Sequence, residues 1–369
     1  MRASVVGATL ILTVFAGPGL AACAVLSRTH GESQAPTATQ TIPAPSATGL
    51  PRVRLVATGG TISNRSGGRL TAEELVNTLP GVERYVRPEF EQFSNVASGS
   101  LTLKQWIDLA NRINALFSDE DDLAGVVVTS GTDTLEETAY FLDLTVRSEK
   151  PVVVVGSMRN PSTLGYEGAA NLLDAYRVAG DPVSRGKGVL VVLNSEINSA
   201  RDVTKTDAHR LDTFRSRDYG MLGVVDTDRV VYYRDVVKRH TTRSEFDVSQ
   251  LDALPRVDVI LTYQGASGDV IKAVVDQGAK GIVIAAAGAG ATSGTQEEGI
   301  RYAVDKGVFV VTATRTGGGR IAFRGRGSSG PRLQIQGEDL APVKARILLM
   351  LALTRTQDGA VIQRMFTEY

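Results

Sequence analysis

Short valine-rich segments alternate along most of the chain with longer segments that carry apolar residues at helical spacing. A strand that is apolar on both faces must be covered on both faces, and helices between successive parallel strands provide that cover. The alternation therefore predicts an α/β fold from about residue 52 onward. Strands are expected at 53–57, 126–129, 152–155, 189–193, 257–262, 282–286 and 308–312, and helices at 102–117, 135–146, 168–179, 269–277 and 296–305.

The alternation lapses in a polar stretch that contains the run from His240 to Glu245. We interpret this stretch, residues 234–255, as a linker between two domains. The larger N-terminal domain, residues 51–233, is expected to contain a parallel sheet. The C-terminal domain, residues 256–369, is expected to be a smaller α/β unit.

The first fifty residues follow a different pattern. Arg2 precedes an apolar run from Val5 to Phe15, which is too short to span a bilayer as a stable helix. A charged start, a short apolar core and small residues near a cleavage site are typical of a secretory signal. We therefore expect a signal peptide at residues 1–22, followed at 23–50 by a flexible tether rich in Ala, Thr, Ser and Pro.

Leu-Ala-Ala-Cys at residues 20–23 resembles the bacterial lipobox, in which the cysteine is lipidated and becomes the new N-terminus. Cys23 is the only cysteine of the chain. Two or more acyl chains on one residue hold a protein durably on a membrane. We expect export across the inner membrane and a periplasmic or cell-surface location, anchored through Cys23. A plain signal peptide is the alternative, because small residues also suit ordinary cleavage.

Charge and composition exclude several classes of function. The 40 Lys and Arg residues balance 40 Asp and Glu residues, so no net charge draws the chain onto nucleic acid. One cysteine cannot form an internal disulfide. The three histidines share no ligand spacing, so we expect neither a metal nor another cofactor.

Two loops rich in glycine and threonine follow two of the predicted strands. The first reads Thr-Gly-Gly-Thr at residues 58–61, and the second reads Ser-Gly-Thr-Asp-Thr at residues 130–134. Parallel sheets bind ligands at the carboxyl ends of their strands. Glycine allows close approach of the backbone, and threonine supplies hydroxyl groups that donate, accept or attack. Either loop alone reads as an ordinary turn, but the pair predicts a ligand site.

These loops resemble the Thr-Gly-Gly-Thr and Gly-Thr-Asp-Thr signatures of bacterial type II L-asparaginases. The resemblance continues through residues 136–146, 151–159, 201–206, 246–249, 254–255, 345–349 and 351–354. It implies hydrolysis of the side-chain amide of L-asparagine to L-aspartate and ammonia through a threonine acyl-enzyme. It also implies a homotetramer whose sites lie between one N-terminal domain and a partner's C-terminal domain.

The resemblance also assigns catalytic roles. Thr61 corresponds to the nucleophile, Thr132 to a second catalytic hydroxyl, and Lys205 to the base that acts on Thr132. Asp133 corresponds to the carboxylate that orients Lys205 and binds the substrate α-ammonium group. A lysine works as a base only where burial or nearby positive charge brings its pKa toward neutrality. Which threonine attacks first stays open, and a solvated surface lysine is the alternative interpretation of Lys205.

The resemblance assigns substrate-binding positions as well. Ser98 corresponds to the serine that binds the α-carboxylate, and Ser157 stands where a backbone carbonyl holds the leaving amide. Gly60, Gly99, Gly131, Thr132 and Asp133 complete the set of substrate-binding residues. Gly99 replaces a glutamine found in many relatives, so one substrate contact is expected to be missing or made by water.

The chain departs from the family pattern at other positions. Ser130 replaces the histidine of His-Gly-Thr-Asp, and Gly265 replaces an asparagine that relatives often bring from a neighbouring subunit. The loop at residues 64–70 is short and lacks the lid tyrosine, the next tyrosine being Tyr85. We expect altered hydrogen bonding beside the site and weaker exclusion of water.

Two alternative functions follow from the same residues. L-Glutamine differs from L-asparagine by one methylene, which a pocket discriminates by only about 1–3 kcal/mol, so glutamine is a possible main substrate. A lipid-anchored solute-binding protein would also have two lobes and a tether. Binding an amino acid requires neither paired threonines nor a lysine base, so the motifs favour the hydrolase.

Overall fold

The computed structural model describes residues 49–322 and 333–369, and all structural statements refer to these two ranges. The predicted signal peptide, Cys23 and nearly all of the predicted tether lie outside them. No helix in the described ranges is both long enough and apolar enough to cross a membrane. Within the same ranges, no three His, Cys, Asp or Glu side chains are grouped so that they could hold a metal ion.

An eight-stranded mixed sheet forms the core of the N-terminal part, in the order β12-β11-β8-β7-β6-β5-β1-β4. The strands β4, β1, β5, β6 and β7 are parallel to one another. The next three are antiparallel to their neighbours: β8 to β7, β11 to β8, and β12 to β11. The bounds are β1 (Arg52–Gly59), β4 (Arg87–Val96), β5 (Leu123–Thr129), β6 (Val152–Val155), β7 (Val189–Leu193), β8 (Glu196–Ser199), β11 (Gly223–Val225) and β12 (Val230–Tyr232).

The antiparallel strands are a difference from the all-parallel sheet that the sequence led us to expect. Asn194 and Ser195 alone connect β7 to β8, and both have positive φ angles, 55° and 58°. Two successive residues with positive φ are typical of a tight hairpin turn, which makes the next strand antiparallel. This short turn therefore ends the parallel part of the sheet.

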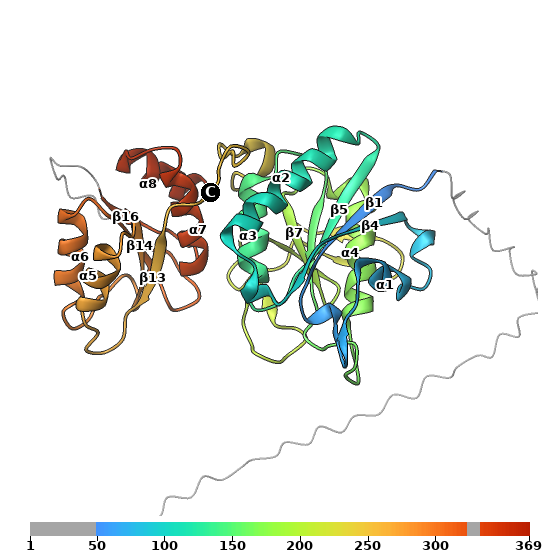
Figure 1. The fold of residues 1–369 in the computed structure, drawn as a ribbon, viewed down its shortest axis with the longest axis horizontal. Helices are drawn as coiled ribbons and strands as arrows, with labels where there is room; N and C mark the ends of the chain where they lie inside the picture. Colours follow the sequence, from blue (N-terminus) through green and yellow to red (C-terminus); the bar gives the residue numbers. More distant parts are fainter. Residues whose placement is uncertain (1–48, 323–332) are drawn as a thin grey trace, which may run out of the picture. The chain divides into compact units, whose positions relative to one another are not determined.

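Helices cover both faces of this sheet (Figure 1). Val126 and Val128 of β5 pack in one apolar cluster with α2 (Leu103–Asp119) and α3 (Leu135–Thr145). Val127 packs in a second cluster with α1 (Ala72–Asn77) and α4 (Gly168–Gly180). Neighbouring valines thus face opposite layers, which confirms the expected strand buried on both faces.

A second, four-stranded parallel sheet has the order β13-β14-β15-β16. Its strands are β13 (Val257–Leu261), β14 (Gly281–Ala286), β15 (Phe309–Thr314) and β16 (Gln334–Gln336). The helices α5 (Asp269–Asp276) and α6 (Gln296–Asp305) pack on one face, and α7 (Pro342–Leu353) and α8 (Gly359–Glu368) pack on the other. The α/β fold with a smaller second sheet is confirmed.

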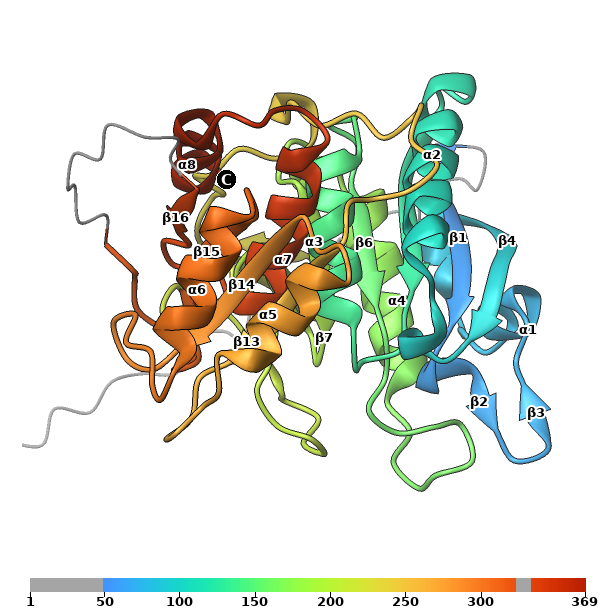
Figure 2. The same ribbon diagram turned by 60° about the vertical axis from the view of Figure 1, so that its left-hand side comes forward.

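Helix α7 connects the two parts of the molecule. It lies between β14 and α3, as Figures 1 and 2 both show. Residues from Ile347 to Ala352 are fully buried, in one apolar cluster with residues of α3. Because this helix is covered on all sides, apolar residues occupy all of its faces.

Two small antiparallel pairs lie outside both sheets. The strands β2 (Asn64–Arg65) and β3 (Gly68–Arg69) form a hairpin in the short loop after Thr61. The strands β9 (Thr204–Lys205) and β10 (Phe214–Arg215) form the second pair, with Lys205 opposite Phe214. The second pair carries the predicted catalytic lysine.

Candidate active site

The two threonine-rich loops leave adjacent strands of the large sheet and touch through their backbones. The Thr58 hydroxyl donates to the Thr129 carbonyl at 2.6 Å, and the Thr58 N–H donates to Thr129 Oγ1 at 3.1 Å. Gly60 has a φ of 92°, and a Cβ added to it would lie 2.3 Å from the Gly131 nitrogen. Glycine is therefore required at Gly60, both for the backbone angle and for the close approach.

The second loop brings three of the predicted catalytic side chains together. The Lys205 ammonium group donates to Thr132 Oγ1 at 3.1 Å and to Asp133 Oδ1 at 2.7 Å. Thr132 is buried, and the Lys205 side chain is mostly buried, whereas the Asp133 side chain is 82% exposed. The arrangement can move a proton between Thr132 and Lys205 and leaves the Asp133 carboxylate open to a cationic group.

Thr61 occupies a different setting from Thr132. It begins a 3₁₀ turn, Thr61–Ser63, and is only partly buried. In the described parts of the chain, the two side-chain hydrogen bonds of the Lys205 ammonium go to Thr132 and Asp133 and not to Thr61. The close contact between Gly60 and Gly131 nevertheless places Thr61 next to the second loop.

Ser98 and Gly131 also adjoin each other. A Cβ added to Gly131 would lie 2.8 Å from Ser98 Oγ, and Ser98 is itself buried. No atom lies within 4 Å of the Cβ position at Gly99, so the space beside this residue is open. The predicted substrate-binding residues Gly60, Gly131 and Ser98 thus adjoin one another in that order, next to Thr132 in the chain.

Ser157 is fully buried in the loop after β6, and its hydroxyl donates to the Arg159 carbonyl at 2.6 Å. This hydroxyl is engaged within its own loop, and the role that the resemblance assigns to this position requires only the backbone carbonyl. The preceding Gly156 packs tightly on the second loop: an added Cβ would lie 2.6 Å from the Ser130 carbonyl oxygen and 3.3 Å from Thr132 Cγ2. Ser130 is buried, so the residue that replaces histidine faces protein rather than solvent.

The short loop after Thr61 forms a compact hairpin fixed at several points. Arg69 Nη1 donates to the Gly60 carbonyl at 3.3 Å, and the Ser66 N–H donates to Ser162 Oγ at 2.8 Å. Tyr85, the first tyrosine after this loop, packs against a different residue: the central carbon of the Arg177 guanidinium lies 4.9 Å from the centre of the Tyr85 ring. Gly265 belongs to the loop after β13, where its N–H donates to Ser293 Oγ at 3.0 Å.

Sequence reasoning missed three residues that hold this site. Arg69 secures the hairpin, and Glu136 accepts hydrogen bonds from Thr204 Oγ1 at 2.9 Å and from the Lys205 N–H at 3.2 Å. Lys344 is fully buried beside the same segment. The sequence does contain one indication that Lys344 is buried, because it lies near the start of a helix that is otherwise almost entirely apolar.

Two family models match the chain, namely the N-terminal asparaginase domain over residues 52–238 and the glutaminase/asparaginase C-terminal domain over residues 256–366. The L-asparaginase 2 of Bacillus subtilis (strain 168) is 42% identical over 374 residues, covering 98% of this chain and 97% of that protein. The glutaminase-asparaginase of Pseudomonas fluorescens biotype A is 36% identical, covering 90% of this chain and 95% of that protein.

A solved structure gives the same result. The crystal structure of a probable cytoplasmic L-asparaginase from Campylobacter jejuni superposes with a TM-score of 0.82 at 39% identity, covering 86% of this chain and all of that chain. Together the two family models span most of the sequence, and several relatives match over nearly their whole length. The chain therefore belongs to the asparaginase family of amidohydrolases.

Proposed function

We propose that the protein hydrolyses the side-chain amide of L-asparagine to L-aspartate and ammonia, with L-glutamine as a slower substrate. The main support for this proposal is that the Lys205 ammonium group bonds both Thr132 Oγ1 and Asp133 Oδ1. The relatives named L-asparaginase 2 support asparagine, whereas those named glutaminase-asparaginase support glutamine as the alternative main substrate. A pocket discriminates one methylene by only about 1–3 kcal/mol, so activity on both amides is expected.

In the proposed mechanism a threonine oxygen, assigned to Thr61, attacks the amide carbon and forms a tetrahedral intermediate. The Thr61 hydroxyl proton passes to Thr132 as the Thr132 proton passes to Lys205, which acts in this step as the neutral amine. The same relay returns a proton to the departing nitrogen, so that ammonia leaves and a threonine ester remains. Water then attacks the ester carbon, releases L-aspartate and restores the threonine hydroxyl. Asp133 and Ser98 hold the substrate ammonium and carboxylate groups during both steps.

The division of the chain belongs to the same proposal. Residues 51–233 form the catalytic domain and residues 256–369 the C-terminal domain, joined by the linker 234–255. Residues 1–22 direct export, and the tether at 23–50 carries a lipid on Cys23. The assembly is a homotetramer.

Two measurements test these parts of the proposal. Replacing Cys23 with Ser should release the protein from membranes. Analytical ultracentrifugation should give the mass of four chains.

The direct test of the reaction replaces Lys205 with Met. Positioned proton transfer contributes about 10²–10⁴ in rate, so kcat for ammonia release should fall by that factor while the fold stays intact. Lys104→Met is the matched control, because Lys104 is exposed and pairs with Asp108 on the surface of α2. Wild-type turnover in Lys205→Met would overturn the role of Lys205. Binding of asparagine without ammonia release by the native protein would instead favour the solute-binding function.

A further inference from the structure

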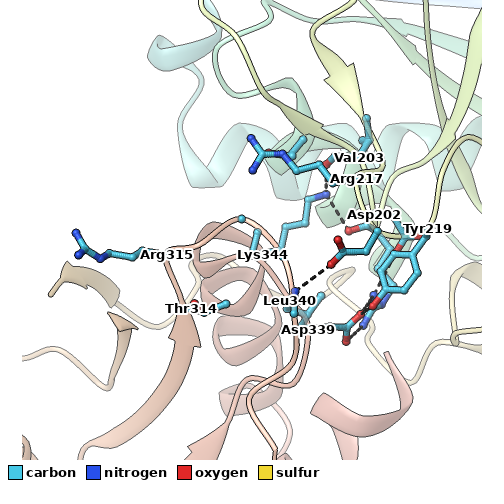
Figure 3. Close-up of a pocket in the computed structure, with 16 residues that line it drawn as sticks. Asp202, Val203, Arg217, Tyr219, Thr314, Arg315, Asp339, Leu340 and Lys344 are labelled. Atoms are coloured by element: carbon cyan, nitrogen blue, oxygen red, sulfur yellow. Dashed lines mark hydrogen bonds and ion pairs between the residues drawn. The ribbon is translucent and has the colours of Figure 1, made fainter. Parts of the chain in front are cut away.

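A lysine of the C-terminal domain holds the segment that carries Lys205. Lys344 is the third residue of α7, and its side chain is buried. Figure 3 shows this side chain pointing from its helix toward the segment of Asp202 and Val203, at the edge of a cavity of about 220 Å³. A buried ammonium group is costly unless its protons are all bonded, so its partners indicate what it does.

The three protons of the Lys344 ammonium group have three backbone acceptors. They are the carbonyl oxygens of Ala200 and Arg201, both at 2.9 Å, and that of Val203. All three carbonyls belong to the turn between β8 and β9, directly before Thr204 and Lys205. An ammonium group has three donors and no acceptor, so this set satisfies it completely. The turn is thereby folded around the lysine head group.

Glu136 holds the residues that follow this turn. It lies in the first turn of α3, three residues after Asp133. Its Oε1 accepts from Thr204 Oγ1 and from the Lys205 N–H, and its Oε2 lies 3.9 Å from Lys344 Nζ. The backbone of Lys205 is therefore fixed between a carboxylate that follows the second catalytic loop and a cation from the C-terminal domain.

A neighbouring pair provides an internal comparison. Arg346, also on α7, lies 3.9 Å from Glu137 on α3, and its Nε donates to the Val257 carbonyl at 2.9 Å. This pair joins the same two helices, but neither of these contacts involves residues 200–205. Arg346 thus shares the connection between α7 and α3 with Lys344, but its ion pair and its hydrogen bond go to residues outside the segment that carries Lys205.

We propose that Lys344 is a positioning residue for the hydrolysis, which fixes the Lys205 backbone through the turn at 200–203 and through Glu136. The proposal rests on the proposed role of Lys205 as the base. A displacement of about 1 Å in a reacting group can lower a rate about 100-fold. The C-terminal domain therefore contributes to catalysis within its own chain, by placing the base rather than by touching the substrate.

The principal test compares Lys344→Met with Arg346→Met. Methionine matches the lysine side chain as far as Cε but leaves the three carbonyls without the ammonium donor. We expect kcat to fall about 10- to 100-fold in Lys344→Met with KM within about threefold, because Ser98 and Asp133 are not moved. Arg346→Met should keep kcat within about threefold. Equal turnover in the two variants, or a rise in KM alone, would overturn the proposal.

Loss of folding in Lys344→Met is tested separately. The turn has a second anchor, because Arg201 pairs with both carboxylate oxygens of Asp339, at 2.8 and 2.9 Å, so the variant should fold. If it does not, Thr204→Val removes only the hydroxyl that bonds Glu136 and should lower kcat about three- to tenfold. Unchanged turnover in Thr204→Val would then contradict the proposal.

The pH profile gives a readout that a purely structural role would not move. Burial lowers the pKa of Lys344 to about 8, opposed chiefly by the nearby negative charge of Glu136. Above that pH the amine has one donor fewer than the turn has carbonyls. We expect an alkaline fall in kcat with a midpoint near pH 8 in the wild type and in Arg346→Met, and its absence in Lys344→Met. The other groups that face Lys344 are Asp202, Arg201, Asp143 and Tyr140.

The outcome for Lys205→Met separates this proposal from the function on which it rests. A fully active Lys205→Met variant would remove the role of the base, and with it the role of Lys344. The other outcome is that Lys205→Met is inactive while Lys344→Met has the same kcat as Arg346→Met. That result would leave the proposed function standing and overturn only the positioning role of Lys344.

Discussion

The two catalytic loops lie side by side but are held in different ways. In the second loop Thr132 is 5% exposed, its neighbour Ser130 is fully buried, and Lys205 bonds the Thr132 hydroxyl. In the first loop Thr61 is partly buried and precedes an exposed hairpin at residues 64–68. The buried Thr58 hydroxyl ties the first loop to the strand that precedes the second. Lys205 bonds the second loop directly, whereas the first loop continues into a surface hairpin.

This difference indicates a division of labour between the loops. Lys205 bonds both the Thr132 hydroxyl and the carboxylate of the next residue, Asp133, so the groups that can carry a proton lie at the second loop. Thr61 is placed by the contact of Gly60 with Gly131 and by hydrogen bonds to the backbone on either side of it. The Gly60 carbonyl accepts from Arg69 and Ser63, and the Ile62 carbonyl accepts from the Tyr166 hydroxyl. A change in the second loop should therefore affect proton transfer, and a change in the first should affect the position of the nucleophile.

The largest effect is expected from Thr132→Val, which keeps the shape of the side chain and removes the hydroxyl bonded by Lys205. Proton transfer through this hydroxyl should be lost, so kcat should fall by about 10²–10⁴ while L-aspartate still binds. Steady-state ammonia release and calorimetric titration with aspartate measure the two quantities. A variant that loses aspartate binding in proportion to kcat would contradict the assignment of Thr132 to proton transfer.

The position of the covalent ester tests which of the two loops carries the nucleophile. Acid quenching of the wild-type enzyme during turnover, followed by peptide mass spectrometry, should find the aspartyl group on the peptide that contains Thr61. The Thr61→Val variant should show no such adduct. An aspartyl ester on Thr132 would exchange the roles of the two threonines.

A somewhat smaller effect is expected from Gly60→Ala. The added Cβ would lie 2.3 Å from the backbone of Gly131, and neither loop can yield by turning a side chain. Together with the φ of 92°, this should cost about 2–4 kcal/mol of folding free energy and lower kcat about 100-fold. The control is Gly67→Ala, whose φ of 83° is similar but whose Cβ position has no atom within 4 Å. Urea denaturation and turnover should separate the variants, and equal losses would show that the loops do not need this contact.

The sequence predicted the central strands and the helices between them because their burial produces a strong pattern. A valine run such as Val152–Val155 predicts a buried strand when the segments on both sides carry apolar residues at helical spacing. The strand β4 was missed because it lies at the edge of the sheet and mixes charged with apolar residues, as in Arg87, Glu89 and Glu91. The short antiparallel strands were missed because they depend on the turn at Asn194 and Ser195, not on periodicity.

The site was predictable only where residues form a local motif. Thr61, Thr132 and Asp133 lie in loops whose composition is unusual, so their importance can be read directly. Glu136 and Lys344 meet only in the folded chain, more than 200 positions apart in the sequence. A charged residue in an apolar helix indicates a buried partner, but the sequence alone does not identify the partner.

Arg69→Met tests the weaker attachment of the first loop. It removes one partly buried hydrogen bond to the Gly60 carbonyl, which contributes about 1 kcal/mol, so kcat should fall about three- to tenfold. Proteolytic cleavage within residues 64–68 should become faster at the same time. Arg65→Met is the control, since Arg65 pairs with Glu74 on the surface. No change in either measurement would show that the hairpin is held by its own turn and by Ser162.

The smallest effect on turnover is expected at Asp143, in the helix that follows the second loop. Its Oδ1 accepts from the Val189 N–H at 2.8 Å, and burial raises the pKa of this carboxyl to about 7. An unfolded aspartate ionises near pH 3.8, so between about pH 4 and 7 the folded state binds the extra proton. The stabilising contribution is therefore complete below about pH 4 and is lost as the pH rises through 7.

Asp143→Asn keeps the acceptor and removes this ionisation. Relative to the wild type, the variant should gain stability between pH 4 and pH 8, by at most about 4 kcal/mol for a shift of about three pKa units. Urea denaturation at the two pH values measures the gain, and kcat at pH 8 should stay within about twofold. If ionisation of this buried carboxyl does not affect folding, the stabilities of the wild type and the variant will change in parallel between the two pH values.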